Sequence, residues 1–71
     1  MPEALALRIR KLLTDDVPFA YCDSCLALRF SESLEDARAA ALLLAREDGF
    51  IRKLRACYGC GRSVEMTEVG K

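Results

Sequence analysis

Apolar residues recur with the three- to four-residue spacing of a helix in three stretches of this chain, and they alternate with polar residues near its end. In the first stretch Leu5, Ile9 and Leu12 fall on one helical face, which predicts a helix over about residues 3–13. Pro18 cannot donate a backbone hydrogen bond, and it disfavours helical geometry at the residue before it. The first helix is therefore expected to end before Pro18.

A second, shorter helix is predicted to follow the linker. Asp23 or Ser24 can cap its first turn, because both side chains accept hydrogen bonds from the free N–H groups of a helix start. Leu26, Leu28 and Phe30 are expected to form its apolar surface.

The strongest helical signal covers residues 34–47. Ser33 precedes it as a capping residue, and Asp36 stands where a capping box usually has glutamate. Gly49 fits the left-handed position just past a helix end. The pattern therefore predicts a third helix with a defined start and a defined end.

The middle of this third helix, residues 39–45, contains only alanine and leucine and is apolar around nearly its whole circumference. Such a helix is usually buried on several sides. Two interpretations remain open. The rest of the chain covers it, or part of its surface, centred on Leu42 with Ala39 and Ala45, binds a second copy of the chain or another protein.

The C-terminal part is predicted to form a two-stranded hairpin. Its strands are expected over residues 50–56 and 62–67, joined by a tight turn at residues 57–61, and residues 69–71 are expected to be a frayed end. The whole chain, residues 1–71, is thus predicted to be one α+β domain with three helices followed by an antiparallel hairpin. A domain of this length rarely gains more than about 3–5 kcal/mol from its core, so an additional staple is expected.

The cysteines supply that staple. All four occur in two Cys-x2-Cys dyads, Cys22/Cys25 and Cys57/Cys60, which are separated by 31 residues. Two such dyads can place four thiolates tetrahedrally around one Zn²⁺, and an all-sulfur set is typical of a structural site. In the second dyad Gly59 or Gly61 can adopt positive φ and turn backbone N–H groups towards sulfur. We therefore predict one structural zinc ion bound by all four cysteines.

Other uses of the cysteines are less favoured. A tetrahedral tetrathiolate also accepts iron. Two disulfides do not suit a reducing compartment, and a redox-active dithiol or metal-handling protein lacks its usual βαβ context here. Four thiolates leave no open coordination position, and the chain contains no histidine. A non-enzymatic protein is therefore expected.

Charge and hydropathy add two limits. Eleven basic and eleven acidic residues balance, so the net charge gives no general attraction to nucleic acid. The chain has no apolar stretch long enough for a membrane span and no recognisable leader at its start, so a cytoplasmic location is expected.

The order helix, helix, short turn, helix and hairpin resembles the winged helix-turn-helix fold. The residues that carry this resemblance are Leu5, Ile9 and Leu12 in the first helix, Leu26 and Phe30 in the second, Leu34 to Leu44 in the third, and Gly49, Phe50 and Ile51 at the start of the hairpin. The segment from Cys57 to Gly61 is similar to a zinc-ribbon or rubredoxin-like knuckle. One dyad is expected at the start of the second helix and the other at the wing tip, so zinc would clamp the wing to the helices, a feature that the ordinary winged helix lacks.

In winged-helix proteins the third helix enters the DNA major groove and the wing touches the flanking backbone. The resemblance therefore implies a transcription-related module that binds double-stranded DNA weakly. The residues expected to contact DNA are Arg38 in the third helix and Arg52, Lys53, Arg55 and Arg62 in the wing. An equally open interpretation of the wing cations is a solvated face that keeps the strand edge from pairing with other chains. Glu35 and Asp36 at the leading end of the third helix would repel phosphates, which favours the alternative, a protein-interaction module or homodimer that uses residues 34–47.

Overall fold

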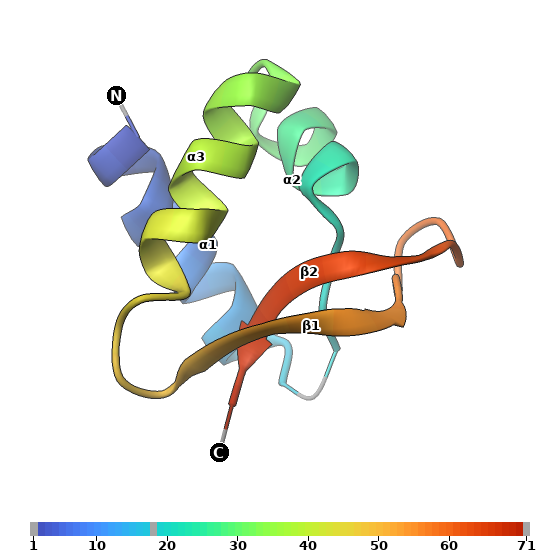
Figure 1. Ribbon diagram of the computed structural model, residues 1–71. Coiled ribbons are helices and arrows are strands. Elements are labelled where there is room, and N and C mark those ends of the chain that lie inside the picture. Colours follow the sequence, from blue (N-terminus) through green and yellow to red (C-terminus); the bar gives the residue numbers. More distant parts are fainter. Residues whose placement is uncertain (1, 18, 71) are drawn as a thin grey trace.

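Three helices precede an antiparallel hairpin in the computed structural model, which describes residues 2–17 and 19–70 (Figure 1). The elements are α1 (Pro2–Asp15), α2 (Asp23–Phe30), α3 (Leu34–Leu44), β1 (Phe50–Ala56) and β2 (Ser63–Val69). The predicted α+β order is confirmed. The expected break at Pro18 and the expected fraying of Lys71 lie outside the described residues.

The helical core forms where α1 packs against α3. Leu5, Ile9 and Leu13 of α1 are buried, and they pack into one cluster with the small residues of α3. The buried residues of α3 are Ala37, Ala40, Ala41 and Leu44. α1 is longer than predicted and reaches Asp15, and the N–H of Asp16 still bonds to the carbonyl of Leu12 at 3.0 Å.

The start of α3 is capped as predicted, because the Ser33 hydroxyl accepts a hydrogen bond from the N–H of Asp36 at 3.1 Å. Its end differs: the helix stops at Leu44 and not at residue 47. The N–H groups of Arg46 and Glu47 bond three residues back, so the chain tightens into turns there. Gly49 has φ +92°, which confirms the left-handed position.

Only part of the apolar surface of α3 is covered. Ala40 and Ala41 are fully buried, whereas Leu42 and Ala39 remain exposed. Thr67 on β2 is buried against this helix, and its hydroxyl donates a hydrogen bond to the carbonyl of Ala41 at 2.8 Å. α1 and β2 therefore cover two sides of α3, and the Leu42 side faces solvent.

The hairpin extends further than predicted. β2 runs from Ser63 to Val69, and Val69 pairs with Phe50. The N–H of Gly70 bonds to the carbonyl of Gly49 at 2.8 Å. The expectation of a frayed end is therefore wrong for Val69 and Gly70, because the ladder continues to Gly49 and Val69 packs against the helical core.

α2 also differs in detail from its prediction. Leu26 is fully buried and Phe30 is half-buried, but Leu28 points into solvent and does not contribute to the core. None of the described helices is long and apolar enough to cross a membrane.

Candidate metal centre

The four cysteine sulfurs converge at the junction between α2 and the hairpin. All four Sγ atoms lie within 4.8 Å of one another. The Sγ atoms of Cys22 and Cys60 are 3.8 Å apart, and those of Cys57 and Cys25 are 3.5 Å apart. The two dyads, although distant in the sequence, thus form a single cluster.

This cluster has the dimensions of a tetrahedral thiolate site. With metal–sulfur bonds of about 2.3 Å, the sulfurs of a tetrahedron lie about 3.8 Å apart, close to the separations seen here. Cys22 and Cys57 are buried, Cys25 is half-buried and Cys60 is exposed. The four cysteines are therefore positioned to coordinate one metal ion.

The first dyad is placed by the start of α2. Cys22 is the N-cap residue, with φ −72° and ψ 167°, and no side chain caps the helix. The prediction that Asp23 or Ser24 caps α2 is therefore wrong, since Asp23 is already the first helical residue and its carboxylate points elsewhere. Thiolates at a helix start are favoured by the unpaired N–H groups and by the positive end of the helix dipole.

The second dyad is placed by the turn between the strands. The N–H groups of Cys22 and Gly59 donate to the sulfur of Cys57 at 3.2 and 3.3 Å. Gly61 has φ +78°, as predicted for this turn. A Cβ atom on Gly59 would lie 3.0 Å from the sulfur of Cys25, so this glycine allows the two dyads to approach.

The surroundings shift the pKa values of three thiols. The backbone N–H and the guanidinium of Arg62 lower the pKa of Cys60 to about 6. Burial acts to raise the pKa of Cys57, but hydrogen bonds from three backbone N–H groups outweigh it and the pKa is lowered. Burial, together with hydrogen bonds among the thiols, raises the pKa of Cys25. A cation that replaces the proton is needed to hold Cys25 as a thiolate.

Apolar and aromatic residues surround the cluster. Met66 and Ala20 are buried beside Cys22 and Cys57. The ring of Tyr58 stacks on Phe19, with ring centroids 4.0 Å apart. Ala20 and Met66 thus pack against Cys22 and Cys57, whereas the stacked rings of Phe19 and Tyr58 are exposed.

An ionic network next to the cluster was not foreseen from the sequence. The carboxylate of Asp23 accepts hydrogen bonds from Nη2 and Nη1 of Arg52 at 2.6 and 3.2 Å, and from Nε of Arg38 at 3.1 Å. Nη1 of Arg52 also donates to the hydroxyl of Thr67 at 3.1 Å. The network therefore joins α2, α3 and both strands beside Cys22. The one signal in the sequence was the place of Arg52 in β1, since it lies on the same strand face as the partly buried Phe50.

The five residues predicted to contact DNA all have partners within the chain. Arg38 and Arg52 bind Asp23, while Lys53 and Arg55 both pair with Glu68. Arg62 interacts with Cys60 and Cys22, which raises the pKa of its guanidinium. Within the fold these cations thus have different partners, namely Asp23, Glu68 and the cysteine thiols, and do not form one shared cluster. Binding of DNA by these residues stays a prediction.

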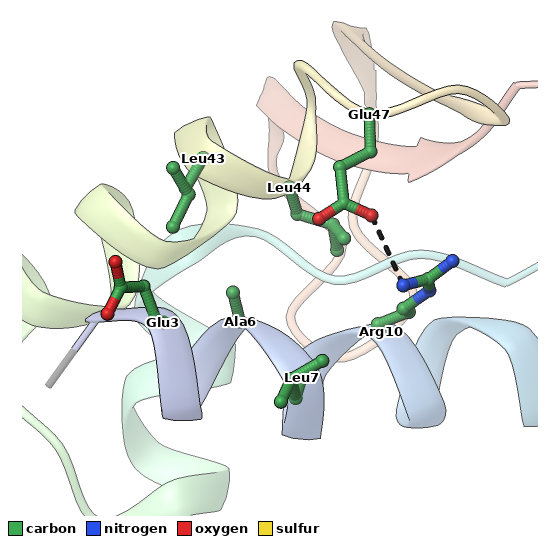
Figure 2. Close-up of a pocket in the computed structure, with 7 residues that line it drawn as sticks. All are labelled: Glu3, Ala6, Leu7, Arg10, Leu43, Leu44 and Glu47. Carbon is green, nitrogen blue, oxygen red and sulfur yellow. Dashed lines mark ion pairs between the residues drawn. The ribbon is translucent and has the colours of Figure 1, made fainter.

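A groove with a volume of about 200 Å³ lies between α1 and α3, on the side of α3 that carries Leu43 and Leu44 (Figure 2). Figure 2 shows Ala6, Leu7, Leu43 and Leu44 along the groove, Glu3 at one end, and the 3.2 Å ion pair between Arg10 and Glu47 at the other. Self-association or partner binding through α3 stays a prediction.

The chain matches no protein-family model, no curated protein and no solved structure. Fold and site together define a class, a small α+β domain with four clustered cysteines positioned to coordinate one metal ion.

Proposed function

We propose that this chain is a non-enzymatic binding module that holds one structural Zn²⁺. The observation that carries the proposal is the convergence of Cys22, Cys25, Cys57 and Cys60 within 4.8 Å. Zinc suits this set because it favours four tetrahedral ligands and binds thiolates well. When bound, the ion would link α2 to the hairpin turn and neutralise part of the thiolate charge.

A cobalt titration tests the metal site. Co²⁺ in a tetrahedral thiolate site gives intense visible absorption, and we expect it to saturate at one equivalent. Cys25→Ser and Cys57→Ser should weaken the band and change its shape. The control Ser24→Ala, which changes a residue between the two cysteines of the first dyad, should leave the band unchanged. Metal analysis of the purified protein then identifies the natural ion. If the purified protein contains iron, iron replaces zinc in the proposal. Absence of the thiolate band in the cobalt titration would refute the metal site.

A protein is the partner class that we favour. Arg38, Arg52, Lys53 and Arg55 each contact a carboxylate of the same chain. After this pairing the four cations keep little excess positive charge for the many phosphates of a duplex, and Glu35 and Asp36 at the start of α3 would repel phosphates. These contacts support a module that binds another polypeptide.

Weak binding of double-stranded DNA is the second candidate, because residues 50–62 contain four cations and no acid. Amide shifts of the metal-loaded protein are recorded with a short duplex at low and then physiological salt. DNA binding should shift the amide signals of Arg38, Arg52, Lys53, Arg55 and Arg62. The double variant Lys53→Gln/Arg55→Gln should weaken binding more than the control Arg29→Gln. Four phosphate contacts correspond to a salt slope of about −3.6. No shifts at low salt would eliminate this candidate.

A further inference from the structure

The outer edge of β1 carries backbone N–H and C=O groups that form no hydrogen bond within the described part of the chain. Hydrogen bonds from Gly70 to Gly49 and from Cys57 to Arg62, both 2.8 Å, fix the phase of the β1–β2 ladder. Bonded and non-bonded pairs alternate in an antiparallel ladder. The backbone groups of Ile51, Lys53 and Arg55 therefore face β2, and those of Arg52, Leu54 and Ala56 face outward.

This outer edge is open. The sheet has only two strands among the described residues, and within them no backbone group bonds to the outward side of Arg52, Leu54 or Ala56. Figure 1 shows β2 between α3 and β1, so the free edge faces away from that helix. The side chain of Leu54 is 70% exposed and Ala56 is exposed too. Such an edge can accept an extended segment as an additional strand.

The side chains beside the edge define the chemistry of that segment. On one face Lys53 and Arg55 share a single carboxylate, that of Glu68, which leaves an excess of one positive charge. On the other face, Leu54 and Ala56 present apolar surface without cover. An added strand fits when its residues alternate, with acidic side chains towards the cations and apolar side chains towards Leu54.

A second copy of β1 fits poorly at this edge. Antiparallel pairing of two copies centred on Leu54 sets Lys53 opposite Arg55 twice, and pairing centred on Lys53 sets this residue opposite itself. Like charges directly opposite each other destabilise a strand pair. The occupant is therefore expected to come from a different protein.

We propose that the outer edge of β1 binds an extended, alternately acidic and apolar segment of a partner protein as a third strand. The inference rests on the proposed function as a binding module and names the surface and the kind of partner. The outward N–H and C=O groups of Arg52, Leu54 and Ala56 give affinity. The face that carries Lys53 and Arg55 selects against basic segments.

Amide hydrogen exchange of the metal-loaded protein tests the proposal. The probe is a capped peptide of alternating valine and glutamate, about eight residues long so that it spans β1. At about ten times its dissociation constant, the peptide should slow exchange at Arg52, Leu54 and Ala56 about tenfold. The amides of Ile51, Lys53 and Arg55 should change little, since they already bond to β2. A valine–lysine peptide is the control and should protect no amide.

Two variants separate the edge from the metal site. Leu54→Pro removes an outward N–H but no β1–β2 bond, and Lys53→Gln with Arg55→Gln removes the charge preference. Both should weaken peptide binding by at least about fivefold and keep the cobalt spectrum, because neither changes a cysteine. Loss of the spectrum in the unsubstituted protein would refute the metal site. If the cobalt spectrum is normal, three results would refute strand addition but leave the metal site standing. These are no protection of Arg52, Leu54 and Ala56 over the other amides, equal protection of all amides, or unchanged peptide affinity in both variants.

Discussion

Asp23 and Arg52 form a two-point ion pair directly beside Cys22 of the cysteine cluster, with Nη2 of Arg52 2.6 Å from Oδ2 of Asp23. The side chains are 4% and 14% exposed, so the pair is largely removed from water. It connects the first residue of α2 to β1, the same two parts of the chain that the cysteines bring together. A metal ion bound by the cysteines would therefore secure the same junction as the ion pair.

Asp23→Asn is expected to destabilise the metal-loaded protein by about 3 kcal/mol, because it leaves the buried guanidinium of Arg52 without its main counter-charge. The matched control is Arg38→Gln, which removes the other cation on Asp23. Its side chain is 56% exposed, so its loss should cost less than about 1 kcal/mol. Urea unfolding at constant metal concentration measures the free energy of unfolding of both variants. Equal losses of stability would contradict the conclusion that Arg52 is the main partner of Asp23.

Thr67→Val is expected to lower the free energy of unfolding by about 1–3 kcal/mol. The substitution keeps the shape of the side chain but removes the hydroxyl that donates to Ala41 and accepts from Arg52, both in a buried place. Thr67→Ser keeps the hydroxyl and should retain these bonds. Thermal or urea unfolding compares the two variants, and a valine variant as stable as the wild type would mean that these bonds contribute nothing.

Gly59→Ala is expected to alter the cobalt spectrum, because the new methyl group would lie 3.0 Å from the sulfur of Cys25. Gly49→Ala is its control. Gly49 has φ +92°, and no atom lies within 4 Å of the position that a Cβ would take there, so this change should cost about 1–2 kcal/mol in stability and leave the spectrum unchanged. Identical spectra for the two variants would show that Gly59 does not set the distance between the dyads.

Removal of the metal by a strong chelator is expected to unfold most of the chain. Structural zinc supplies an apparent 10–16 kcal/mol or so in small finger peptides, whereas a core of this size gives only about 3–5 kcal/mol. Amide spectra before and after chelation, and after zinc is added back, provide the measurement. Well-dispersed amide signals in the metal-free protein would be the contrary result.

The cysteine cluster and the order of elements followed from local features of the sequence. The dyads are recognisable because ligand spacing is a short-range property, and Ser33 and Gly49 mark helix ends through backbone groups only a few residues away. β1 was predicted with its observed bounds, Phe50–Ala56.

The features that the sequence did not reveal depend on long-range pairing. Asp23 looked like a helix cap, but its partner Arg52 lies 29 residues further along the chain. Thr67 is polar and was expected on an alternating strand, yet the carbonyl of Ala41 makes its burial possible. The length of β2 was underestimated because the register of the hairpin, and not the composition of residues 67–69, decides where pairing stops.

The linkage of residues 22 and 60 through a metal would turn the segment between them into a closed ring that contains α2, α3 and β1. α1 lies outside this ring, as an arm attached by apolar packing on α3 and by ion pairs between exposed side chains such as Arg8 and Glu32. Such pairs contribute little, so the arm is held mainly by Leu5, Ile9 and Leu13. Undocking of the arm would uncover the alanines of α3 while the ring stays closed. Metal binding would therefore survive undocking of α1, whereas loss of the metal is expected to unfold the helical core as well.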